Sequence, residues 1–157
     1  MTDINFYLQE KNKHVSLENL LSGSGLSTIY RYFAETGDIK ESPRVTEEMH
    51  YKEPAAVITE YAESGDELCS QSLDCFVDIY GAAAGNVALQ YYPIKELYIA
   101  GGIAPKIRKR IETGRFIKAF VDKGLMQSVM EKISVKLIVG KDTGLEGALI
   151  YIKTLYL

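Results

Sequence analysis

The sequence has little of what marks several large classes of protein. It holds only two cysteines, Cys69 and Cys75, which are too few for a disulfide framework or a four-ligand zinc site. No apolar run reaches the roughly 18–20 residues of a membrane span. Segment 1–14 is polar and mixed in charge, unlike a signal peptide. We therefore expect a cytoplasmic protein, in a reducing compartment, with no membrane partner.

An excess of basic charge is missing as well. Eighteen Lys and Arg stand against 21 Asp and Glu, so the formal net charge is -3, and this argues against nucleic acid as a partner. The rest of the composition is ordinary for a globular protein, with 46% hydrophobic and 25% charged residues. The length of 157 residues suits a single domain over 1–157, or one lobe of a larger protein.

Short apolar segments in front of glycines predict strands. We expect three of them, at about 17–21, from 97 to 100 and at 135–139. Each is followed by a helical pattern, and this alternation favours an α/β fold with parallel strands and surrounding helices.

Apolar residues at helical spacing predict the helices. Segment 4–12 is compatible with a short one, and Ser24 is a candidate cap for a helix that ends at Gly37. The polar segment 37–53 is expected to be a surface connection. The other expected helices are one from 54, a long one after Gly65 that ends before Pro93, an interrupted one over 105–132 with breaks near Gly114 and Gly124, and a last one from 145.

The middle of the long helix is rich in small residues, from Gly81 to Gly85. Small side chains let another backbone approach closely, at some cost in helix propensity. The partner backbone is either in the same lobe or in a second subunit.

Three glycine turns lie between an expected strand and an expected helix: Ser22–Gly25, Ala100–Pro105 and Gly140–Gly144. Ligands of open α/β sheets bind beyond the carboxyl ends of the strands, and helix N-termini suit phosphate groups. One such turn alone is more often simply a tight connection. Three in one short chain favour a phosphorylated ligand, although neither the P-loop nor the dinucleotide-binding motif occurs.

Candidates for acid–base chemistry are few. Glu18 precedes the first glycine turn, where its carboxylate could accept hydrogen bonds from a polyol or could simply be solvated. Asp122 is expected to cap a helix or form a salt bridge. His14 and His50 lie in polar segments without a catalytic partner, and the two cysteines are expected in the core. We assign no catalytic residue and no metal ligand.

Several segments resemble conserved stretches of bacterial-type glucokinases. Segment 21–31 (LSGSGLSTIYR) resembles the family's LSGPGLxNIYR, and 98–105 (YIAGGIAP) resembles YIAGGIxP. Further blocks follow the family's order from about His14 onward. These are 53–59 (EPAAVIT) beside PxxIT, 85–89 (GNVAL) beside GNLAL, 120–126 (FVDKGLM) beside FxDKGRM, and 144–148 (GLEGA) beside PGLLGAA.

The resemblance implies an actin-like, ribonuclease-H-like fold of two lobes, of which this chain is the C-terminal one. It implies ATP-dependent phosphorylation of the 6-hydroxyl of glucose, a step of glycolysis, with Mg²⁺. It also implies that Gly101 and Gly102 belong to the adenosine motif, that Ser22 and Gly23 contact the nucleotide, and that Glu18 binds sugar hydroxyls.

Departures from the family pattern imply that this chain alone is inactive. The family's Asp-x-Gly-Gly-Thr phosphate loop and its Asn-Asp pair, whose aspartate is the general base, do not occur here. Ser24, Thr28 and Leu125 replace the family's Pro, Asn and Arg, and the C-x₅-C spacing does not fit the zinc cluster of the related ROK kinases. A complementary N-terminal half or a homodimer is the expected protein partner. The alternative is a non-catalytic module for sugar or nucleotide binding, or for dimerisation.

Overall fold

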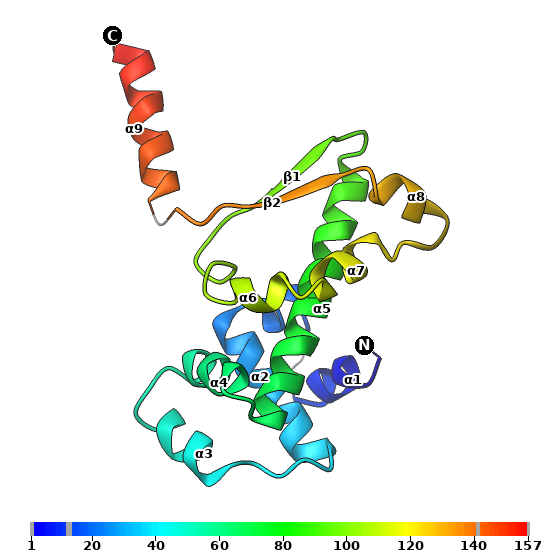
Figure 1. The fold of residues 1–157 in the computed structure, drawn as a ribbon, viewed down its shortest axis with the longest axis vertical. Coiled ribbons are helices and arrows are strands. Elements are labelled where there is room, and N and C mark those ends of the chain that lie inside the picture. The colour runs from blue at the N-terminus through cyan, green and yellow to red at the C-terminus, as the bar shows by residue number, and fades with distance from the viewer. Residues whose placement is uncertain (1, 12–13, 141, 157) are drawn as a thin grey trace.

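Helix α5, Glu67–Gln90, is the central rod of the molecule, and most other elements pack around it (Figure 1). The computed structural model describes residues 2–11, 14–140 and 142–156. The side chain of Asp66 caps α5 by accepting a hydrogen bond from the backbone N–H of Cys69. The spacing of Cys69, Leu73, Phe76, Tyr80, Ala83 and Val87 predicts one buried stripe. Its first three members are at most 1% exposed, whereas Val87 at its end is 42% exposed, so the stripe is buried only in the first half of α5.

Helices α2 and α4 pack against the first half of α5 and complete the core there. Ile29 of α2 and Ile58 of α4 are fully buried between the helices. The elements of this half are α1 (Thr2–Lys11), the 3₁₀ helix η1 (Leu17–Asn19), α2 (Gly23–Thr36), α3 (Pro43–Met49) and α4 (Pro54–Glu63).

The second half of the chain carries a two-stranded parallel sheet. Its register runs from Glu96 opposite Ser134 to Ile99 opposite Leu137. The crossover between the strands consists of short helices, since a parallel pair needs a long connection. The elements are β1 (Glu96–Ile99), α6 (Arg108–Ile111), α7 (Arg115–Val121), the 3₁₀ helix η2 (Gly124–Met126), α8 (Gln127–Met130), β2 (Ser134–Leu137) and α9 (Thr143–Tyr156).

The small residues of α5 pack against α7 of the same chain. A Cβ atom on Gly81 would lie 2.3 Å from the carbonyl oxygen of Phe116, and one on Gly85 would lie 2.4 Å from that of Phe120. Glycine is therefore required at both positions by the close approach of the α7 backbone. The small residues from Gly81 to Gly85 therefore pack against a backbone of the same lobe, and this one of the two expected partners is confirmed.

The prediction of a strand at 17–21 is wrong. Leu17–Asn19 is a 3₁₀ helix, in which the backbone N–H of Ser16 donates to Oδ1 of Asn19 at 2.7 Å, and that of Leu21 donates to the carbonyl of Leu17 at 2.9 Å. These local bonds take the place of a strand ladder. The sheet of the described residues therefore has two strands rather than three, and strands alternate with helices only after residue 95.

Two helix predictions also need correction. Segment 37–53 contains helix α3, whose Val45 is fully buried, although the sequence shows no helical periodicity there. The helix expected from Pro105 begins at Arg108, after a series of turns. The breaks near Gly114 and Gly124 are confirmed, and both glycines have positive φ.

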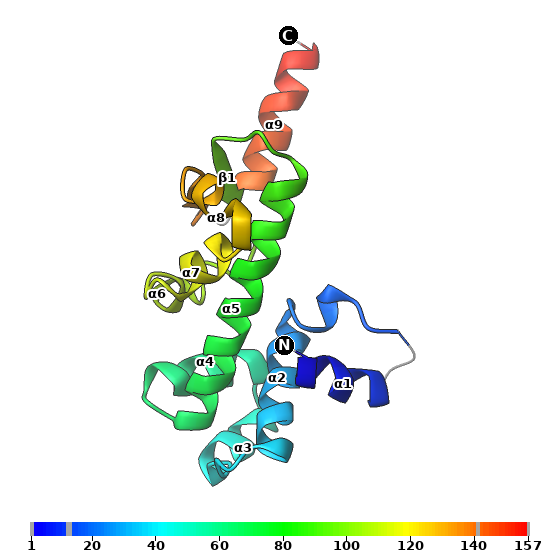
Figure 2. The same cartoon turned by 90° about the vertical axis from the view of Figure 1, so that its right-hand side faces the viewer.

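Helix α9 projects away from the helical body, beyond the two strands, in both views (Figures 1 and 2). Every residue from Asp142 to Leu155 is exposed. Among the described residues, no helix is both long and apolar enough to cross a membrane.

Candidate functional site

Ser22 organises the first glycine turn. Its hydroxyl accepts a hydrogen bond from the backbone N–H of Gly25 at 3.0 Å and donates one to the carbonyl of Glu18 at 2.8 Å. Ser22 is thus the cap of α2, and the prediction of Ser24 in that role is wrong. Gly25 is required because a Cβ there would lie 2.4 Å from the backbone of Leu20. The hydroxyl of Ser22 therefore links the residue before the turn, Glu18, to the first turn of α2 at Gly25.

A cavity of about 410 Å³ opens beside this turn, between α2, α4, α5 and the turns that follow Gly102. Its apolar walls include Leu26, Phe76 and Ile107. Polar groups at the cavity come from three parts of the chain. They are Ser22, Gly23, Glu53, Thr59, Glu60, Glu63 and Lys106. An apolar cavity with a few polar groups at its edge is the usual form of a small-molecule site.

The cavity joins two of the three glycine turns singled out in the sequence. Ser22 and Gly23 line it from the start of α2, and Ile103 lines it from the turn that follows the second glycine pair. Gly101 and Gly102 are exposed at the end of β1 and do not line the cavity themselves. Gly101 has a φ of 112°, which favours glycine, and it redirects the chain toward Ile103.

The other predicted site residue, Glu18, lies in η1 rather than at the end of a strand. It is exposed and does not line the cavity. Its backbone carbonyl nevertheless binds the hydroxyl of Ser22, which does. Glu18 is therefore connected to the cavity only indirectly, by the hydrogen bond from Ser22 to its carbonyl.

The third glycine turn lies elsewhere. The hydroxyl of Thr143 donates to the carbonyl of Gly140 at 3.1 Å, and α9 then leads away from α2 and α4 (Figure 1). Residue 141, within this turn, is outside the described residues. The turn contributes no lining residue to the cavity.

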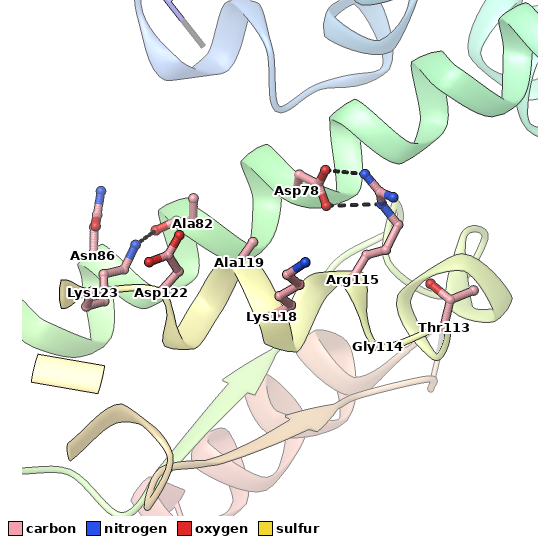
Figure 3. Close-up of a pocket in the computed structure, with 10 residues that line it drawn as sticks. All are labelled: Asp78, Ala82, Asn86, Thr113, Gly114, Arg115, Lys118, Ala119, Asp122 and Lys123. Carbon is pink, nitrogen blue, oxygen red and sulfur yellow. Dashed lines mark hydrogen bonds and ion pairs between the residues drawn. The ribbon is translucent and has the colours of Figure 1, made fainter. Parts of the chain in front are cut away.

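A second and larger hollow, of about 730 Å³, runs along α5 and α7 (Figure 3). Three of its charged groups bind to α5 or to a residue of α7. Arg115 forms a salt bridge with Asp78, which raises the pKa of its guanidinium, and Lys123 donates to the carbonyl of Ala82. Asp122 follows the last residue of α7, as expected of a capping residue. These contacts hold α7 on α5.

The cysteines and histidines offer no reactive centre here. Cys69 is buried and Cys75 half-buried, and burial raises the pKa of both thiols, that of Cys75 to about 11. His14 and His50 are exposed. In the part of the chain that the structure describes, no group of three His, Cys, Asp or Glu side chains could hold a metal ion.

Sequence reasoning missed most of the cavity wall. Leu26 and Phe76 belong to apolar stripes that are expected to be buried in any case, so nothing marks them as lining residues. Lys106 follows the Gly101–Pro105 turn closely and could have been flagged as a cation beside a glycine turn. The acidic residues of α4 give no signal, because they look like any solvated helix face.

Comparison with known proteins supports the resemblance. The family model described as Glucokinase matches residues 2–155. A glucokinase of Nostoc sp. strain PCC 7120 is 38% identical over 156 aligned positions, covering 90% of this chain and 46% of that protein. A glucokinase of Saccharophagus degradans is 35% identical over 135 positions, covering 86% and 40%.

A solved structure is similar as well. The crystal structure of glucokinase from an Antarctic psychrotroph superposes with a TM-score of 0.75 at 32% identity, covering 90% of this chain and 41% of that one. The chain thus has the fold of part of a glucokinase, and it spans less than half the length of the curated relatives that it matches. On the strength of the family match over nearly all of its length, the chain belongs to the glucokinase family.

Proposed function

We propose that this chain is the C-terminal lobe of an ATP-dependent glucokinase, which converts glucose and ATP to glucose 6-phosphate in glycolysis. In this role it supplies contacts to the nucleotide and to the sugar. The observation that carries the proposal is the 410 Å³ cavity, which joins Ser22 and Gly23 to the turn after Gly102. The family membership and the length of the chain relative to its relatives support it further.

The cavity suits the adenosine part of ATP. Leu26, Phe76 and Ile107 offer apolar surface for a flat base, and Thr59 offers a hydroxyl. The phosphates would extend toward the first N–H groups of α2 and the ammonium of Lys106, because helix N-termini and lysine favour anions. Mg²⁺ is proposed to bind with the phosphates of ATP, whose negative charge it would neutralise.

Glu18 is the proposed sugar contact. Its exposed carboxylate lies in the turn whose other end, at Ser22, borders the cavity. A carboxylate accepts hydrogen bonds from sugar hydroxyls, so a glucose at Glu18 would lie next to the phosphate end of the nucleotide. The phosphate loop and the aspartate base are proposed to come from another lobe, and this chain alone is proposed to be inactive.

Binding of ATP tests the cavity. ATP is expected to raise the melting temperature of the chain, since a ligand that binds only the folded state stabilises it. The variant Thr59→Phe places an aromatic ring in the cavity and should abolish the shift. Thr46→Phe is the matched control, because Thr46 also bonds a backbone carbonyl of its own helix but does not line the cavity. An equal ATP response in both variants would refute the nucleotide site.

Turnover is tested separately with an assay that couples glucose 6-phosphate to NADPH. The chain alone should give no signal, and addition of the separately expressed N-terminal half of a related glucokinase should restore one. Robust activity of the chain alone would overturn the proposed inactivity. Ligand binding that never leads to turnover would favour the non-catalytic binding module instead.

A further inference from the structure

A further cavity, of about 480 Å³, lies between α2, the end of α3 and the start of α4, and is called the α2–α3 cavity below. Ser24 and Ser27 line it from one side of α2, whereas Ser22 and Leu26 line the 410 Å³ cavity from another. Among the described residues, Glu53 alone lines both. The two cavities are therefore separate candidate sites.

The wall of the α2–α3 cavity contains an unsatisfied hydroxyl. Tyr30 lines the cavity and is 2% exposed, and its hydroxyl forms no hydrogen bond of normal geometry with any described residue. Burial, with the charge of nearby Glu41, raises the pKa of this phenol well above its ordinary value, so the hydroxyl keeps its proton and remains a donor. A buried donor without an acceptor is unfavourable, and a bound molecule is one way to satisfy it.

The rim of the cavity carries unpaired charges of both signs. Arg31 is exposed, and its guanidinium forms no ion pair or hydrogen bond with the described part of the chain. The carboxylates of Glu41 and Glu53 also line the cavity, and neither belongs to an ion pair among the described residues. A guanidinium binds a carboxylate with two parallel hydrogen bonds, and a carboxylate binds ammonium groups. The rim therefore offers a place for an anionic group and a place for a cationic one.

The remaining wall of the cavity is apolar. Met49 and Pro54 are partly buried, and Ile58 is fully buried. Such side chains favour contact with a hydrocarbon group of a ligand and offer no hydrogen bond to a polar one. A molecule that matches the whole cavity is therefore charged at one end and apolar at the other.

We propose that the α2–α3 cavity binds an α-amino acid with an apolar side chain. The carboxylate of the amino acid binds Arg31 and accepts a hydrogen bond from the hydroxyl of Tyr30. Its ammonium group lies between the carboxylates of Glu41 and Glu53. Its side chain covers Ile58. The ligand thereby supplies a partner to each of the unpaired groups.

Other classes of small molecule satisfy these walls less well. A simple anion would lie beside two carboxylates. An amine without a carboxylate would leave Arg31 and Tyr30 without an acceptor. A neutral sugar has hydroxyls for Ser24 and Ser27, but it brings no charge to Arg31 and no apolar group to Ile58. A zwitterion with an apolar side chain is the one of these classes that matches the hydroxyl, the charges and the apolar wall together.

Titration calorimetry of the full chain tests the ligand class. The probe is L-leucine, and two analogues of similar shape each lack one charge: isocaproate lacks the ammonium group and isoamylamine lacks the carboxylate. L-Leucine should bind at millimolar concentration or below, and each analogue should bind at least about tenfold more weakly, because a hydrogen bond to a charged group is lost. No binding of L-leucine, or equal binding of all three molecules, would overturn the proposal.

Substitution of Arg31 tests the position of the carboxylate. Arg31→Gln should weaken the binding of L-leucine at least about tenfold and leave that of isoamylamine unchanged, since the amine has no carboxylate for Arg31 to bind. Arg44→Gln is the matched control, because Arg44 is also an exposed arginine but does not line the cavity. An equal effect of the two substitutions on L-leucine would contradict the proposed position.

Tyr30→Phe separates a ligand contact from a structural role. The variant should bind L-leucine several-fold more weakly, because it lacks the donor, and should be at least as stable as the parent chain. A residue with a merely structural role would change binding only by destabilising the fold. Unchanged affinity for L-leucine in Tyr30→Phe would show that the hydroxyl does not contact the ligand and would overturn the proposed geometry.

This inference and the proposed function are distinguishable. Arg31 does not line the 410 Å³ cavity, so Arg31→Gln should keep the ATP-dependent rise in melting temperature. Thr59 does not line the α2–α3 cavity, so Thr59→Phe should keep its affinity for L-leucine. Binding of ATP without binding of L-leucine would refute the amino-acid site alone. Binding of L-leucine without binding of ATP would support the amino-acid site and refute the nucleotide site.

Discussion

The ammonium nitrogen of Lys123 donates a hydrogen bond to the carbonyl oxygen of Ala82 at 3.0 Å, although 41 residues separate the two (Figure 3). The lysine reaches this carbonyl by crossing α5 above Gly85, where a Cβ atom would lie 2.6 Å from its Cε. The absence of a side chain at Gly85 therefore makes room both for the lysine stem and for the backbone of α7. This contact fixes the second half of the chain on the central helix.

Substitution of Gly85 by alanine should destabilise the protein. The new methyl group would meet the carbonyl oxygen of Phe120 at 2.4 Å, and backbone cannot move aside as a flexible side chain can. Overpacking of this kind costs about 1–3 kcal/mol. Urea denaturation should show this loss in the free energy of unfolding.

The matched control is Gly23→Ala in α2. A Cβ on Gly23 would have its nearest neighbour 3.7 Å away, which is an ordinary contact, so the free energy of unfolding should stay the same or rise slightly. Equal losses in the two variants would contradict the view that the α7 backbone is what requires glycine at position 85.

The cap of α2 gives a second prediction. Ser22→Ala removes the acceptor of the Gly25 N–H and should cost about 1 kcal/mol in the free energy of unfolding. Ser24→Ala should cost clearly less, since the Ser24 hydroxyl contacts that of Ser22 without capping the helix. Thermal or urea unfolding of the two variants compares them directly. A larger loss for Ser24→Ala would reinstate the cap that the sequence predicted.

Long periodic patterns made much of the fold predictable. Apolar residues spaced alternately by four and three positions from Cys69 to Val87 predict α5. Gly114 and Gly124 predict the interruptions of the helical segment 105–132. Both signals are local in the sequence, so they can be recognised without knowledge of the tertiary structure. The 3₁₀ helix at Leu17–Asn19 was not predictable, since its apolar residues and the following glycines suit a strand equally well. Its form depends on the bond between Ser16 and Asn19, which no pattern of hydrophobicity reveals.

The candidate site was predictable only in part. Ser22 and Gly23 were marked by their glycine turn and by the family resemblance, and they do line the cavity. Phe76 and Lys106 join them from distant parts of the chain. Their convergence depends on how α2 and α4 pack on α5, which is a tertiary property. Glu18 was placed beside the right turn but on the wrong kind of element.

The hydroxyl of Tyr30 is buried near the carboxylate of Glu41, but it forms no hydrogen bond of normal geometry with any described residue. Its burial, with the nearby charge of Glu41, raises the pKa of the phenol well above its ordinary value. Because an unsatisfied buried hydroxyl is unfavourable, Tyr30→Phe should leave the free energy of unfolding unchanged or raise it by up to about 1 kcal/mol.

The control for this prediction is Tyr61→Phe. The Tyr61 hydroxyl donates to Oε1 of Glu48 at 2.9 Å, so its removal should lower the free energy of unfolding by about 0.5–1 kcal/mol. If Tyr30→Phe were the more harmful of the two, the Tyr30 hydroxyl would have a partner in solution.

The buried thiols predict how stability depends on pH at the alkaline end. Burial raises the pKa of Cys75 from 9.0 to about 11 and raises that of Cys69 as well, because both folded-state sites disfavour the thiolate. Groups whose pKa is higher in the folded state contribute their full stability below the unfolded pKa and lose it as the pH rises toward the folded one. The free energy of unfolding should therefore be constant with respect to these thiols up to about pH 8 and fall between about pH 9 and 11.

Urea denaturation at pH 7, 9 and 10.5 measures this fall, and Cys75→Ser should make it shallower. Thiol labelling at pH 8 gives an independent check, since only the thiolate reacts. Both cysteines should label slowly in the native protein and rapidly in urea. Rapid native labelling of Cys75 would show that its thiol is not shielded in the folded protein. Cys75→Ser and the parent chain should then show the same decline with pH, caused by Cys69 alone.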